Sequence, residues 1–107
     1  MSEIATATTT KTARILVIGK HDYILEKVES VLREQGYETF GTLEDETVLK
    51  QLRVGDYDAL LIGGGVAPNS RLSFIELIQS TKPHMRVIEH FGGPATLVHE
   101  VKAVLPI

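Results

Sequence analysis

The chain has 107 residues, of which 43% are hydrophobic and 23% are charged, and its formal net charge is −3. This length and composition are typical of one globular domain with a single hydrophobic core. The lysines and arginines are scattered and form no basic stripe, which argues against a nucleic-acid-binding protein. Cysteine is absent, so the sequence excludes disulfides, thiolate zinc sites and cysteine nucleophiles.

Residues 1–13, MSEIATATTTKTA, are rich in Thr and Ala and contain little to bury. We expect them to form a flexible leader before a domain that spans residues 14–107. No apolar run approaches the roughly 20 residues of a membrane-spanning helix, and no signal-peptide pattern opens the chain. The sequence therefore predicts a cytoplasmic protein that does not associate with membranes.

Four short apolar segments alternate with segments of helical periodicity. The segments expected to form strands are 14–19, 37–40, 58–62 and 85–91. The first is a continuous β-branched run, which is typical of a strand buried on both faces of a parallel sheet. Because strands separated by helices imply right-handed crossovers, the pattern predicts one parallel sheet covered by helices on both faces.

The helices are predicted from apolar residues spaced three and four apart and from residues typical of helix ends. Asp22 is the expected N-cap of the first helix, acidic residues 44–46 open the second, and Pro94 takes the first position of the fourth. Gly36 and Gly55 are expected to end the first two helices. The residues predicted to face inward are Leu25, Val28 and Leu32; Val48, Leu49 and Leu52; Phe74, Leu77 and Ile78; and Leu97, Val98, Val101, Val104 and Leu105.

Together these segments resemble the receiver domains of two-component response regulators, which have a flavodoxin-like fold. The likeness rests on four segments. Residues 15–18 precede a predicted helix, as in the first βα unit of a receiver, and residues 34–38 have the E-x-G-Y-x pattern that leads into its second strand. Residues 57–62 resemble the third strand, and residues 74–88 resemble the third helix with the strand that follows it. It covers most of the chain from Arg14 onward. The resemblance implies a three-layer α/β fold.

One βα unit of a standard receiver is missing from this chain. Receivers normally insert a helix and a fifth strand between the fourth strand and the last helix, whereas here only Gly92-Gly93 intervene as a turn. We therefore expect a parallel sheet of about four strands in the order 2-1-3-4. Helices one and four should cover one face of this sheet, and helices two and three the other.

Phosphorylation in the receiver family requires carboxylates that this chain lacks at the matching positions. Two acidic residues after the first strand, with an aspartate that ends the third, hold Mg²⁺, and that aspartate accepts the phosphoryl group. The resemblance places the acidic pair on Gly19 and Lys20 and the acceptor on Gly63. Asp22 is the nearest remaining carboxylate in the sequence, and one carboxylate is a poor magnesium site.

The residues that stabilise the transferred charge are replaced as well. The resemblance places the family's Thr or Ser on His90 or Phe91 and its Lys on Gly93. The resemblance thus implies a degenerate receiver that is not an enzyme, is not phosphorylated on aspartate, and uses no metal or cofactor.

The leading hypothesis is a non-catalytic signalling or regulatory module that binds a protein partner or itself. If the fourth strand is a sheet edge, Glu89 and His90 are interface candidates, and a homodimer through that edge would replace the missing unit. An equally good interpretation is that Glu89 only blocks unwanted strand pairing, since edge strands often carry charge for that purpose.

The alternative hypothesis is a sensor of a small anionic ligand or phosphate at the carboxyl edge of the sheet. Glycine-rich turns let backbone N–H groups approach an anion, although no dinucleotide or P-loop pattern occurs. The candidate binding residues are Gly19, Lys20, Asp22, Gly63, Gly64 and His90. The four histidines lack zinc-site spacing, and no Ser or Cys nucleophile accompanies them, so hydrolase and metal hypotheses are weak. A phosphotransfer carrier of the sugar-transport type would need a cysteine after the first strand.

Overall fold

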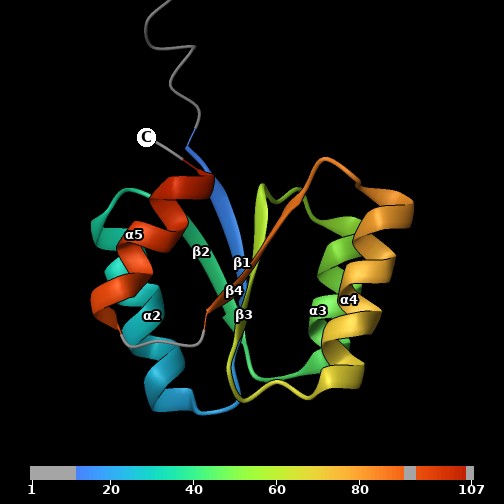
Figure 1. The fold of residues 1–107 in the computed structure, drawn as a ribbon, viewed down its shortest axis with the longest axis horizontal. Coiled ribbons are helices and arrows are strands. Elements are labelled where there is room, and N and C mark those ends of the chain that lie inside the picture. The colour runs from blue at the N-terminus through green and yellow to red at the C-terminus, as the bar shows by residue number, and fades with distance from the viewer. Residues whose placement is uncertain (1–11, 91–93, 106–107) are drawn as a thin grey trace, which may run out of the picture.

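The computed structural model describes residues 12–90 and 94–105, in which four strands alternate with four helices (Figure 1). The strands are β1 (Arg14–Ile18), β2 (Glu38–Thr42), β3 (Ala59–Gly63) and β4 (Arg86–His90). The helices are α2 (Asp22–Glu34), α3 (Asp45–Val54), α4 (Pro68–Thr81) and α5 (Pro94–Val104). The predicted alternation of strand and helix is confirmed.

All strand pairs are parallel, and the sheet has the predicted order β2-β1-β3-β4. Ile18 pairs with Thr42 of β2 and with Ile62 of β3, and Gly63 pairs with His90 of β4. The carboxyl ends of all four strands therefore lie at one edge of the sheet. Within the described residues β4 is an outer strand, paired only with β3.

The two faces of the sheet carry separate hydrophobic clusters. Ile15 and Val17 of β1 pack with residues of α2 and α5, whereas Leu16 and Ile18 pack with residues of α3 and α4. Figure 1 shows the two helix pairs on opposite sides of the sheet, as predicted. All four of these β1 side chains are at most 3% exposed, which accounts for the continuous apolar run in the sequence.

The ends of some elements differ from the expectation. The N-cap of α2 is His21, and Asp22 is the first helical residue, so the prediction of Asp22 as the cap was wrong. No side chain caps this helix, and Asp22 instead places negative charge in its first turn. Strand β2 runs on through Gly41 to Thr42, because both residues pair with β1.

Several sequence predictions fall on residues that the structure does not describe. Residues 1–11 of the expected leader, Phe91 and the expected Gly92-Gly93 turn lie outside the described residues. Ala13 is described, and it packs against the cluster formed with α2 and α5. In the part of the chain that is described, no helix is both long enough and apolar enough to cross a membrane.

Candidate functional site

The carboxyl edge of the sheet brings together most of the residues singled out in the sequence. Gly19 and Lys20 follow β1, Gly63 is the last residue of β3, and His90 is the last residue of β4. Since Gly63 and His90 are register partners, the ends of β3 and β4 are direct neighbours. Glycine at the end of β3 leaves backbone, without a functional side chain, at the centre of this edge.

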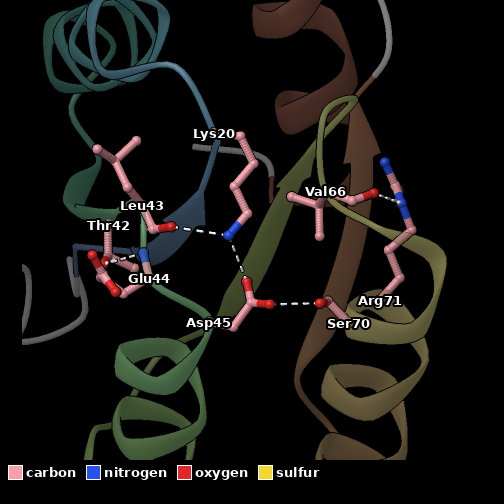
Figure 2. Close-up of polar contacts among 8 residues, drawn as sticks. All are labelled: Lys20, Thr42, Leu43, Glu44, Asp45, Val66, Ser70 and Arg71. Atoms are coloured by element: carbon pink, nitrogen blue, oxygen red, sulfur yellow. Dashed lines mark hydrogen bonds and ion pairs between the residues drawn. The ribbon is translucent and has the colours of Figure 1, made fainter.

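Lys20 is committed to an ion pair with the start of α3. Its ammonium lies 2.8 Å from Oδ1 of Asp45 and donates to the carbonyl oxygen of Leu43 at 3.0 Å (Figure 2). The other carboxylate oxygen of Asp45 accepts from the hydroxyl of Ser70 on α4 at 2.5 Å. Lys20 and Asp45 thus join the turn after β1 to the first turns of two helices.

Electrostatics at this cluster favour the ionised form of Asp45. Hydrogen bonds from Lys20 and then from Ser70 lower the pKa of Asp45 below its ordinary value, against a smaller opposing effect of burial. The side chains of Lys20 and Asp45 are 33% and 37% exposed, so solvent screens the pair in part. The ammonium of Lys20 is therefore paired with the carboxylate of Asp45, and an anionic ligand would have to compete with that carboxylate for it.

Arg71 on α4 holds the glycine-rich turn that follows β3. Its guanidinium donates to the carbonyl oxygens of Gly63 at 2.8 Å and Val66 at 3.0 Å, and Figure 2 shows the second of these bonds. A third bond, of 2.6 Å, reaches Oε1 of Glu89 on β4. One side chain that is only 13% exposed therefore fixes both the turn and the end of the neighbouring strand.

The two interface candidates on β4 point to opposite faces, as the strand alternation predicts. Glu89 lies on the α4 side, is 42% exposed and pairs with Arg71. His90 lies on the α5 side and is 8% exposed, and its Nδ1 is 2.5 Å from Oε1 of Glu100. Of the two, only Glu89 presents its side chain at the surface of the chain.

A pocket of about 470 Å³ opens at the carboxyl edge beside α2. Five of the six residues proposed as ligand-binding line it: Gly19, Lys20, Gly63, Gly64 and His90. Asp22, the first residue of α2, is not among its lining residues.

Sequence reasoning missed the contribution of α2 to this pocket. Ile24, Lys27 and Val28 line it at spacings of three and four, which places them on one face of the helix, and the N-cap residue His21 lines it as well. Tyr23 and Ile24 are 72% and 51% exposed, although both are large and hydrophobic. These two apolar residues lie outside the predicted buried face of the helix, and that position was the feature of the sequence that could have indicated a binding surface there.

The described residues contain no group of three or more His, Asp or Glu side chains placed to hold a metal ion. Magnesium prefers about six oxygen ligands in octahedral arrangement. Lys20, which follows β1, supplies an ammonium where the family resemblance would require a carboxylate. The residues present at this edge do not fit a magnesium site.

No protein-family model matches the chain, and no curated protein matches it by sequence. Solved structures do match. A CheY-like response regulator receiver domain from Methanospirillum hungatei has a TM-score of 0.68 at 18% identity, over 88% of this chain and 77% of that chain. The response regulator TrrA from Thermotoga maritima, solved with Mg²⁺ and BeF, has a TM-score of 0.67 at 24% identity, over 87% of this chain and 81% of that chain.

The fold is that of a receiver domain. A putative response regulator from Chloroflexus aurantiacus extends the likeness, with a TM-score of 0.58 and 21% identity over 91% of this chain and all of that chain. The flavodoxin-like receiver fold expected from the sequence is confirmed, in a form with four strands. At these identities the likeness establishes the fold, and function is argued from the residues of this chain.

Proposed function

We propose that this chain is a non-catalytic receiver-fold module that regulates by binding a protein partner and is not phosphorylated on aspartate. The observation that carries the proposal is Gly63 at the end of β3, where a receiver's acceptor aspartate is expected from the resemblance. Glycine has no carboxylate to attack a phosphoryl group, so the covalent step has no nucleophile at this position.

The surroundings of Gly63 support the same conclusion. Lys20 after β1 carries the opposite charge to a magnesium ligand, and its ammonium is bonded to Asp45. The positive charge of that ammonium would repel a divalent cation at this edge. Phosphoryl transfer in receivers depends on such a cation to neutralise the developing charge.

Incubation of the full chain with acetyl phosphate and Mg²⁺ tests this proposal by intact-mass spectrometry. We expect the mass to stay unchanged under conditions that phosphorylate an active receiver domain run in parallel. A phosphoryl group that is acquired and is labile to hydroxylamine, as acyl phosphates are, would overturn the proposal.

The edge of β4 is the surface that we assign to the partner. The N–H of Arg86 donates to Asp58 on the β3 side at 3.0 Å. Since successive residues of a strand turn their backbone groups to opposite edges, the N–H groups of Val87 and Glu89 face away from β3. These groups form a template on which a further strand can add, from a second copy of the chain or from another protein.

Self-association through this edge is tested by sedimentation of Glu89→Pro beside Glu89→Gln. Proline removes the outward N–H and is tolerated on edge strands, whereas glutamine removes only the charge that pairs with Arg71. If copies pair through β4, wild type and Glu89→Gln sediment as dimers and Glu89→Pro as a monomer. Dimerisation of Glu89→Pro to the same extent as wild type would discard this edge as the interface.

A further inference from the structure

The pocket at the carboxyl edge is lined mostly by apolar groups. Aliphatic side chains of β1, α2 and β3 form its wall, among them Val17, Leu25, Val28 and Leu61. Gly63, Gly64 and Gly65 follow on the β3 side and present backbone to the pocket. A volume of about 470 Å³ lies in the range of pockets that enclose small organic molecules.

Basic side chains, and no acidic ones, occur among the described residues that line this pocket. The described residues that line it include two lysines and two histidines and no aspartate or glutamate. The whole chain has the opposite balance, with 14 acidic against 11 basic residues. The ammonium of Lys20 is paired with Asp45, which leaves Lys27, exposed on α2, as the cationic group at the mouth, with the exposed N-cap residue His21 beside it as a polar group.

His90 adds a polar group to the buried part of the wall. Oε1 of Glu100 on α5 lies 2.5 Å from its Nδ1, and this contact restricts the orientation of the imidazole ring. Nε2 takes no part in this contact, and His90 lines the pocket, so we assign Nε2 as the ring nitrogen that meets a ligand. Such a fixed polar group in an apolar wall is the usual device that orients a bound small molecule.

From this combination we infer that the pocket binds a small soluble amphipathic acid: an apolar body with one carboxylate or similar anionic group. The apolar body lies against the aliphatic wall and Ile24, and the acid faces Lys27 and His21. This site goes beyond the proposed interaction module and does not depend on it. Ligand binding and partner binding are measured separately, so either can fail alone.

Decanoate, used below its micelle concentration, is the probe, and 1-decanol is its uncharged analogue. Titration of the ¹⁵N-labelled full chain should give saturable amide shifts at Gly19 and at Gly63 to Gly65. We expect decanol to bind roughly threefold to tenfold more weakly, because it lacks the negative charge that the ammonium of Lys27 attracts.

Three exposed substitutions locate the site and separate its two components. Lys27→Glu should weaken decanoate roughly threefold to tenfold and leave decanol unchanged, while Ile24→Asp should weaken both more than about tenfold. Lys50→Glu on α3 makes the same charge change away from the pocket and should alter neither affinity by more than about twofold. Circular dichroism confirms that each variant is folded.

Several results would overturn this inference. They are the absence of saturable shifts with decanoate, equal affinity for decanol, or equal effects of Lys27→Glu and Lys50→Glu. Co-sedimentation with anionic vesicles in the absence of decanoate shifts would assign the exposed Tyr23 and Ile24 to a lipid surface, and would also overturn it.

Discussion

The ammonium of Lys20 lies 2.8 Å from Oδ1 of Asp45, although 25 residues separate them in the chain. This contact joins the turn after β1 to α3, and the bond from Ser70 extends it to α4. The turn after β1 and the first turns of α3 and α4 are therefore connected by side chains of the polypeptide itself.

Asp45→Asn should lower the free energy of unfolding by about 1 kcal/mol, because it removes the charge that Lys20 and Ser70 both meet. Urea denaturation measures the change. Glu46→Gln, a neutralisation at an exposed residue in the same helical turn, is the matched control and should change stability by less than about 0.5 kcal/mol. Equal losses of stability in both variants would mean that any negative charge in the first turn of α3 has the same effect, and that the contacts of Asp45 with Lys20 and Ser70 contribute nothing more.

Acid should remove the contribution of Asp45 to stability. Its pKa is lower in the folded chain, so the contribution is complete above the unfolded pKa of about 4 and is lost as the pH falls through the folded value. The stability difference between wild type and Asp45→Asn should be constant from neutral pH to about pH 5 and should shrink below about pH 4. A difference that is independent of pH down to the lowest pH at which the chain folds would contradict the ion pair.

Arg71→Met should destabilise the chain by about 1–3 kcal/mol, since it removes the guanidinium that donates to the carbonyl oxygens of Gly63 and Val66. The loss should appear first in the turn, as faster hydrogen exchange of the Val66 amide, which donates to Gly63. Glu89→Gln removes only the exposed partner of Arg71 and should cost less than about 1 kcal/mol. If the Val66 amide exchanges equally fast in both variants, the ion pair with Glu89, and not the bonds to the two carbonyl oxygens, accounts for the protection of the turn.

Phe74→Ala should cost about 3–5 kcal/mol, because this side chain is 1% exposed and fills the core between α4 and the sheet. Leu72→Ala on the same helix removes a side chain that is 58% exposed and should cost less than about 1 kcal/mol. Thermal denaturation of the two variants gives the comparison. Similar melting temperatures would argue against the described packing of α4.

Gly63→Asp should not by itself restore phosphorylation. The new carboxylate would lack the acidic pair that holds Mg²⁺ in a receiver, since Gly19 and Lys20 occupy those positions, so the mass after treatment with acetyl phosphate should stay unchanged. A Cβ at this position would lie 3.3 Å from the carbonyl oxygen of Ile18, so we also expect a modest drop in melting temperature. Phosphorylation of this single variant would show that Gly63 alone separates the chain from an active receiver.

The parts of the fold that depend on local pattern could be predicted from the sequence. The apolar run of β1 marked a strand buried on both faces, and the spacing of Leu97 and Val101 marked the inner face of α5. The end of β2 was missed because Gly41 suggests a strand end. Glycine fits at this position inside the strand because a Cβ would approach the side chains of Leu25 and Glu29 on α2 within 3 Å.

The contacts of the site depend on tertiary structure and left no local signal. Gly19, Lys20, Gly63 and His90 were placed at one edge because parallel strands align their carboxyl ends. The direction of the Lys20 side chain toward Asp45, and the grip of Arg71 on two carbonyl oxygens, depend on how α3 and α4 pack. No periodicity or spacing encodes such long-range pairs.

The positive charge on Lys20 is covalently part of the chain, whereas a metal ion must be captured from the surrounding medium. In this domain the counterion of Asp45 is the side chain of Lys20, which lies in the turn that follows β1. Under the proposed function, we therefore expect neither chelators nor changes in divalent ion concentration to alter this contact.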